Sequence, residues 1–433
     1  MQRLHQQQIA TYIINTENKI EAFNSLYEVY CESQAQDYGV VTGINYALEE
    51  LSSYQNEFVS VVKMIMSRSD SGGICLPFIV HALFQFMRPD DVKQLVYSYS
   101  NSQRDIWMYL FFVEIPKEQI NEETIQELYK FLLDEQLDSS KGFSLRDYHF
   151  LEKYSSVDNK VIVKATEIIF SKRISHPNLV ICYFGGMFRD SKNPSALLDA
   201  YADNIPLLCD LYAFLYVSGW NLDHDGFYLC ELLKADSVMI DKIADSIIDI
   251  KKNKHYNHVD SRFCAIYYTY NYVEIISCLA DKIIERMKRP TRYVSGALSV
   301  LFLVPENKTD ILSLQQEWVT RYIRKNAMNS EKMEYIFETV ANNSFGMMKE
   351  CVAAFIECNK DYSAFKMLTI TPTSYGGWGS FVPHYSKCID VLKSLLPLFT
   401  GIDTIQHKKA IEQEIEVYRK RIREEQITNI IEG

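Results

Sequence analysis

Apolar residues recur three and four positions apart along most of this chain, which is the spacing of one buried face on an α-helix. The C-terminal stretch shows the pattern most clearly. There, Ile411, Ile415, Tyr418 and Ile422 follow one another at spacings of 4, 3 and 4, and charged residues fill most positions between them. The pattern predicts a terminal helix that packs on one partner through a single apolar seam.

The same pattern predicts a succession of helices along the rest of the chain. Residues 2–32 and 38–67 each read as one long helix, because the apolar stripe runs through both stretches. The other helices that we expect cover residues 75–87, 88–99, 102–113, 121–133, 156–170, 236–250, 261–288, 291–303, 310–325, 329–340, 344–358 and 361–368, with a short helix starting at 193 and another after Pro383.

Helix starts recur at regular intervals in the middle of the chain. Capping residues at Asn121, Ser156, Asn193 and Asp236 lie about 35, 37 and 43 residues apart, and each start follows another apolar helical pattern. Stacked helix pairs repeat at about 34 to 47 residues. The sequence therefore predicts an all-α fold, an α-solenoid of irregular HEAT-like or TPR-like helix pairs that ends in a C-terminal capping helical pair.

This fold prediction divides the chain into three segments. Residues 1–115 form an N-terminal helical segment, and residues 116–368 form the irregular repeat array. Residues 369–433 hold a glycine-rich aromatic loop and the capping helices. Terminal repeats of such arrays need a polar outer face, and the charged residues of the last helix supply one.

The aromatic loop is the most unusual stretch of the sequence. Tyr375, Trp378 and Phe381 are interspersed with three glycines, which free the backbone. One interpretation is a plug of aromatic side chains packed on the last helices. The other is a recognition loop, because aromatic residues are frequent anchors in protein interfaces. These three residues are our candidate partner-binding residues.

Composition narrows the class of protein. Hydrophobic residues make up 47% of the 433 residues, which excludes global disorder, and the net charge of −11 argues against non-specific nucleic-acid binding. The ten cysteines are scattered, and residues 1–8 lack the apolar core of a secretory signal. The longest apolar run, residues 74–87, is too short to span a bilayer. We therefore expect a cytoplasmic protein with reduced thiols and no membrane partner.

No complete catalytic or metal-binding motif is present in the sequence. Asn221–Gly226 matches the first half of a calcium loop, but its twelfth position is Leu232 instead of an acidic ligand. His149 and His176 follow arginines at a shorter spacing than ribonuclease motifs use. We accordingly expect no metal and no cofactor.

Two stretches carry a resemblance to a known group of proteins. They resemble the C-terminal helical-repeat, sensor-like region of large bacterial proteins that contain a STAND-type NTPase, some of which act in phage defence. In the C-terminal stretch, the residues that carry the resemblance are Thr371, Pro372, Tyr375, Gly377–Ser380, Val382, Pro383, Leu395, Leu396, His407 and Lys408. The second stretch is residues 201–233, with the Asp223–Gly226 turn. The chain departs from those proteins in having no NTPase segment.

Three functions follow from these patterns. The leading hypothesis is a non-catalytic helical-repeat module that binds another protein, and the resemblance implies a phage protein or a defence-system subunit as that partner. The second is a helical nuclease or hydrolase that uses His149, His176 or the Asp223 and Asp225 turn. The third is a structural subunit that self-associates through its C-terminal helix.

Overall fold

The fold is all-α, as the sequence predicts. The computed structural model describes residues 2–32, 38–67, 76–98, 104–135, 147–189, 194–253, 261–287, 291–304, 308–373 and 380–432. About 81% of the chain is helical, and no strand occurs in these ranges. The chain divides into two compact units, Met1–Gly185 and Gly186–Gly433. The three-segment division made from the sequence stays a prediction.

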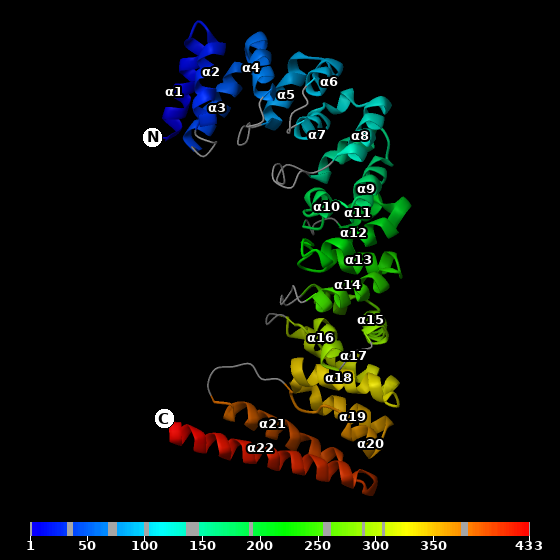
Figure 1. Ribbon diagram of the computed structural model, residues 1–433. Helices are drawn as coiled ribbons and strands as arrows, with labels where there is room; N and C mark the ends of the chain where they lie inside the picture. Colours follow the sequence, from blue (N-terminus) through cyan, green and yellow to red (C-terminus); the bar gives the residue numbers. More distant parts are fainter. Residues whose placement is uncertain are drawn as a thin grey trace. The chain divides into compact units, whose positions relative to one another are not determined.

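The first unit consists of short helices, each of which packs on the next helix in the sequence or on the one after it (Figure 1). Its elements are α1 (Gln2–Asn15), α2 (Lys19–Glu32), α3 (Tyr38–Leu51), α4 (Gln55–Ser67), α5 (Leu76–Phe86), α6 (Pro89–Tyr97), α7 (Arg104–Glu114), α8 (Glu122–Asp134), α9 (Val161–Ser171) and α10 (Pro177–Phe184), with the 3-10 helices η1 (Lys117–Gln119) and η2 (Tyr148–Ser156).

The second unit also consists of helices, and α22 is the longest of those described (Figure 1). Its elements are α11 (Pro194–Ala200), α12 (Ile205–Val217), α13 (Phe227–Ala235), α14 (Met239–Asn253), α15 (Tyr272–Met287), α16 (Thr291–Leu298), α17 (Asp310–Asn326), α18 (Ser330–Asn343), α19 (Met348–Cys358), α20 (Tyr362–Lys366), α21 (Val382–Leu395) and α22 (Ile405–Glu432). Its 3-10 helices are η3 (Ala202–Asn204), η4 (Ser261–Tyr268), η5 (Ser299–Leu301), η6 (Phe345–Met347), η7 (Leu396–Leu398) and η8 (Ile402–Thr404).

The prediction of one long helix at residues 2–32 and another at 38–67 was wrong, because each stretch holds two helices. At the first break, Asn18 accepts a hydrogen bond from the backbone N–H of Glu21 at 3.2 Å and donates to the Glu21 carboxylate at 2.9 Å, so it starts a new helix. At the second, α3 ends at Leu51 and α4 starts at Gln55. The apolar stripe continues across both breaks, and periodicity alone therefore concealed them.

Two of the predicted helix starts have the expected caps. Asn121 accepts from the backbone N–H of Thr124 at 2.9 Å, and Asn329 accepts from that of Lys332 at 3.0 Å. These caps satisfy backbone donors that the first turn of a helix leaves unpaired. At the end of α8, a lysine that directly follows α9 supplies the hydrogen bonds. The Lys172 ammonium donates to the carbonyls of Leu132 and Glu135 at 2.6 and 2.7 Å, at the end of α8.

Within the second unit, alternate helices stack on one another. The helices α12, α14, α16 and α18 pack in sequence, and so do α15, α17, α19 and α21. Large aromatic side chains fill the interior, and Trp318 and Tyr322 of α17 are almost fully buried. The Trp318 indole N–H donates to the Ser277 hydroxyl of α15 at 3.2 Å. This bond joins helices whose residues lie 41 positions apart in sequence.

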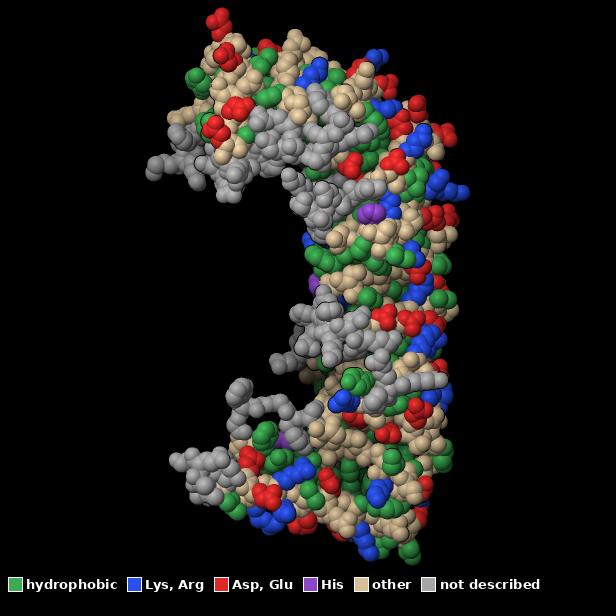
Figure 2. Space-filling model, viewed as in Figure 1, with side chains coloured by type: hydrophobic (Ala, Val, Ile, Leu, Met, Phe, Trp, Pro, Cys, Tyr) green, Lys and Arg blue, Asp and Glu red, His purple; other side chains and the backbone are tan. Residues whose placement is uncertain are grey.

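The terminal pair is the most extensive helix–helix packing in the unit (Figure 1). The seam predicted for the last helix is confirmed for Ile411, Ile415 and Tyr418, which are buried, while Ile422 is half-buried. The charged residues between them are mostly exposed. On the face shown in Figure 2, acidic and basic side chains are interspersed over the described helices.

Candidate functional site

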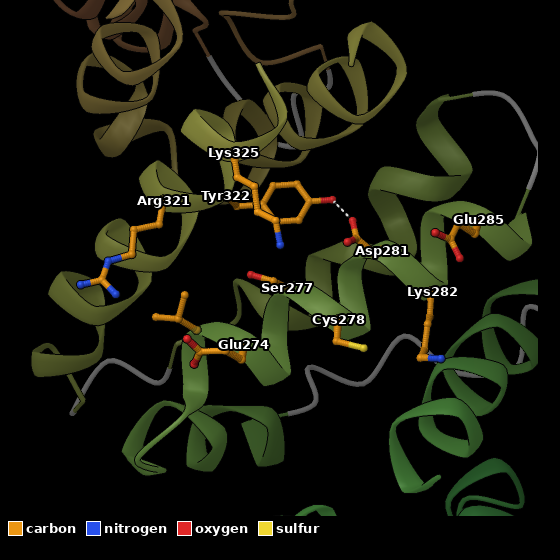
Figure 3. Close-up of a pocket in the computed structure, with 10 residues that line it drawn as sticks. Glu274, Ser277, Cys278, Asp281, Lys282, Glu285, Arg321, Tyr322 and Lys325 are labelled. Carbon is orange, nitrogen blue, oxygen red and sulfur yellow. Dashed lines mark hydrogen bonds between the residues drawn. The ribbon is translucent and has the colours of Figure 1, made fainter. Parts of the chain in front are cut away.

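A groove lies between α15 and α17 in the second unit. Its volume is about 580 Å³, within the usual range for ligand sites. The lining residues are Val273, Glu274, Ser277, Cys278, Asp281, Lys282 and Glu285 of α15 and Arg321, Tyr322 and Lys325 of α17 (Figure 3). The apolar stripe of α15 faces the core, so the opposite, polar side of this amphipathic helix forms the floor.

Asp281 joins the two walls of the groove. Its carboxylate accepts a hydrogen bond from the Tyr322 hydroxyl (Figure 3) and another from the Lys332 ammonium of α18 at 2.6 Å. Burial raises the pKa of Tyr322 well above its usual range, and the bond to Asp281 raises it further. Tyr322 is therefore a fixed donor at physiological pH, and this arrangement holds α15, α17 and α18 together.

Lys282, the residue after Asp281, pairs with a residue earlier in the sequence. Its ammonium donates to Asp241 of α14 at 2.7 Å, and Arg286 contacts the same carboxylate. The hydrogen bond from Lys282 is the main cause that lowers the pKa of Asp241, and the charge of Arg286 adds to it. Two adjacent residues of α15 thus join it to its neighbours: Lys282 to α14, and Asp281 to α17 and α18.

These contacts form part of a Lys–Asp ladder through the second unit. We use this name for the pairs Lys242–Asp210, Lys282–Asp241 and Lys332–Asp281, which join residues 32, 41 and 51 positions apart. The sequence carried a signal for it that we missed. Asp241-Lys242-Ile243 recurs 40 residues later as Asp281-Lys282-Ile283. In both copies, the lysine pairs with an earlier aspartate and the aspartate with a later lysine.

After this pairing, three charged groups of the groove have no partner among the described residues. Arg321 pairs with Glu317 at 2.6 Å, whereas Glu274, Glu285 and Lys325 make no hydrogen bond or ion pair within the described ranges. All three side chains are exposed. In Figure 3, the two glutamates stand at opposite ends of the α15 segment, and Lys325 points from α17 toward α15. The groove therefore offers two separated carboxylates and one ammonium to a ligand.

No protein family, no curated protein and no solved structure matches this chain. The resemblance to sensor regions of bacterial defence proteins stays a hypothesis from the sequence.

Of the three aromatic residues proposed to bind a partner, only one lies within the described residues. Tyr375 and Trp378, and with them the choice between a plug and a recognition loop, lie outside them. Phe381 immediately precedes α21 and is 37% exposed. Its backbone N–H donates to the Glu425 carboxylate of α22, which also accepts from the Ser380 hydroxyl at 2.8 Å. The start of α21 is thus held by the neighbouring helix, and Phe381 remains a candidate contact.

The calcium-like turn has a structural role. Asp223 is 2% exposed and accepts hydrogen bonds from the Tyr212 hydroxyl at 2.8 Å and the backbone N–H of Leu229 at 3.0 Å. Burial is the main cause that raises the pKa of this carboxyl, although these bonds oppose the shift. Gly226 adopts a φ of +74°, and a Cβ there would lie 2.1 Å from the carbonyl oxygen of Arg262. The carboxylate that a calcium ion would need is therefore committed to the start of α13.

The residues proposed for an enzyme are spread over different elements. His149 is exposed and lies 3.0 Å from the Glu152 carboxylate, and the His176 ring contacts the hydroxyl of Ser175 at 2.9 Å. Asp225 is exposed. Among the described residues, no three His, Cys, Asp or Glu side chains gather into a group that could hold a metal ion. None of the described helices is both long and apolar enough to cross a membrane.

Proposed function

We propose that this chain is a non-catalytic helical-repeat module that binds another protein, and that the partner docks along the α15–α17 groove. The observation that carries the proposal is a set of three charges on the groove, Glu274, Glu285 and Lys325, that find no partner among the described residues. The other charged side chains that line the groove are paired within the chain. Unpaired charges that flank a concavity favour recognition of a ligand with complementary charge.

The stacking of the second unit supports an α-solenoid. The Lys–Asp ladder and the Trp318–Ser277 bond join residues 32 to 51 positions apart in the sequence, a spread that brackets the repeat of about 34 to 47 residues in stacked helix pairs. In such arrays each pair contacts its neighbours, and the stack presents an extended surface with fixed spacing. A groove between two stacked helices suits a segment of a partner protein.

The more specific role that we propose is a sensor-like or regulatory part of a bacterial defence system, acting in the cytoplasm. This role rests on the resemblance carried by residues 369–433 and 201–233. In it, the partner is a phage protein or another subunit of the system, and the protein itself performs no chemistry.

Affinity capture with matched charge-reversal variants tests the proposal. The groove variant combines Glu274→Lys with Glu285→Lys. The control variant combines Asp390→Lys with Glu412→Lys, which reverses two exposed acids on α21 and α22 that make no hydrogen bond or ion pair within the described chain. Both variants change the net charge equally. We expect the wild type and the control to retain the same captured protein and the groove variant to lose most of it.

Cross-linking defines where the captured protein lies. A lysine-reactive cross-linker is expected to join it to Lys325 and Lys282 on the groove. A captured protein that binds both variants equally, or that cross-links only elsewhere, would show that the groove is not the docking surface.

A further inference from the structure

The groove carries enough detail to define the chemistry of its ligand. Glu274, Cys278, Asp281 and Glu285 lie at spacings of 4, 3 and 4 on α15, so they share one face of the helix. Asp281 is already bonded to Tyr322 and Lys332. The free carboxylates are therefore those at the two ends of this face.

The distance between these carboxylates sets the length of a ligand. Glu274 and Glu285 are eleven residues apart on α15, and a helix rises about 1.5 Å per residue, which separates them by about 16.5 Å along its axis. An extended peptide covers about 13 to 14 Å in four residues, and residues four apart point to the same side. Two flexible lysine or arginine stems readily cover the remaining few ångströms.

The opposite wall adds a second requirement. Lys325 has no hydrogen-bond or ion-pair partner in the described part of the chain, and it projects toward the groove between the two glutamates (Figure 3). Its ammonium needs an acceptor on the ligand. The Ser277 hydroxyl accepts from Trp318, which leaves its own proton available to donate to a ligand. The middle of the ligand must therefore supply hydrogen-bond acceptors for Lys325 and Ser277.

We propose that the groove binds an extended peptide segment of a partner protein that carries two lysine or arginine side chains four residues apart. This inference rests on the proposed protein-binding function. The two basic side chains pair with Glu274 and Glu285. Backbone carbonyls or an acidic side chain between them accept hydrogen bonds from Lys325 and Ser277.

Lys325 distinguishes a peptide from another cationic ligand of similar length. A linear polyamine also places ammonium groups at both ends, but its internal ammonium groups would meet the Lys325 charge. A peptide instead offers a carbonyl oxygen at every residue, about 3.3 Å apart. The groove thus favours a ligand that carries a positive charge at two points and hydrogen-bond acceptors between them.

Fluorescence anisotropy with two labelled heptapeptides tests the inference. Both are blocked at their ends and carry two lysines among alanines and serines, at the second and sixth positions in one and at the second and third in the other. Their net charges are equal, so non-specific attraction is controlled. At low ionic strength, we expect the spaced peptide to bind the full-length protein at least about threefold more tightly.

Charge-neutralising variants assign the binding to the groove. Glu274→Gln and Glu285→Gln are each expected to weaken binding of the spaced peptide by about threefold to fivefold, as for a partly exposed ion pair, and the double variant by about tenfold. The control, Asp390→Asn with Glu412→Gln, is expected to leave the affinity unchanged. Circular dichroism of each variant checks that it is folded.

The contrary outcomes separate this inference from the proposed function. Equal or undetectable binding of the two peptides, or full affinity in the double variant, overturns the inference. Displacement of the peptide by spermine, with tighter spermine binding to Lys325→Met, would assign the groove to a polyamine. If the charge-reversal variant still loses the captured protein in those cases, docking at the groove stands and only the peptide chemistry is wrong.

Discussion

Acid is expected to loosen the C-terminal helix through one buried histidine. His407 of α22 is fully buried, and neither ring nitrogen has a hydrogen-bond partner within the described residues. The rings of Tyr362, Phe365 and Phe399 surround it, with centroids 5.4, 4.7 and 5.7 Å from that of the imidazole. Such a site accepts a neutral ring and excludes a charged one.

The sign of the pH effect follows from this environment. Burial lowers the pKa of His407 below its ordinary value of 6.5, although the charges of Asp361 and Asp403 oppose the shift. The folded state keeps the ring neutral while the unfolded chain takes up a proton below pH 6.5, so the stability contribution is complete above that pH and is lost as the pH falls. At pH 5, at 1.36 kcal/mol per pH unit, the loss is at most about 2 kcal/mol.

The perturbation that reports this loss is His407→Phe, which keeps a ring among the aromatic neighbours and removes the titration. A larger ring adds a packing cost, but this cost does not depend on pH. A stacked array need not unfold in one step, so hydrogen exchange of the 405–425 segment is the suitable assay. Between pH 8 and pH 5, corrected for intrinsic rates, the opening free energy should fall by up to about 2 kcal/mol more in the wild type than in the variant.

A matched control is His224→Gln, which removes an exposed histidine on a different helix pair. We expect it to behave as the wild type does. If the wild type and His407→Phe lose the same opening free energy between the two pH values, the buried imidazole does not control α22 and the reasoning is refuted.

Three further predictions concern stability and redox state. Asp223→Ala is expected to cost about 2 to 4 kcal/mol in urea unfolding, because it removes the buried carboxylate that accepts from the Tyr212 hydroxyl and from the Leu229 N–H at the start of α13. Calcium should not raise the melting temperature of the wild type, and a calcium-dependent rise would revive the metal site. Lys332→Met is expected to cost about 1 to 3 kcal/mol, because it breaks the half-buried pair with Asp281. Loss of the exposed pair in Lys360→Met should cost less than loss of the half-buried pair, and equal costs for the two would contradict the ladder. All ten cysteines should titrate as free thiols in denatured, unreduced protein, and a count well below ten would indicate disulfides.

The sequence by itself determined the secondary structure and the buried face of many helices. The caps at Asn121 and Asn329 and the seam of Ile411, Ile415 and Tyr418 were all predictable. They depend on residues a few positions apart, whose geometry the helix itself fixes. The breaks at Asn18 and after Leu51 were also local, but the continuous apolar stripe outweighed their weaker signals.

Only the tertiary structure decided the candidate site. An apolar stripe shows which face of a helix is buried but not which other helix covers it, and it says nothing about the neighbour of the polar face. The pairs of Asp281 with Tyr322 and with Lys332, 41 and 51 positions away, depend on how α15, α17 and α18 stack. The same stacking left Glu274, Glu285 and Lys325 unpaired around one groove. Packing between segments far apart in the sequence sets which charged groups are paired, because loop lengths and side-chain volumes fix how the helices lie against one another. No pattern of neighbouring residues could therefore have shown which charges stay unpaired among the described residues.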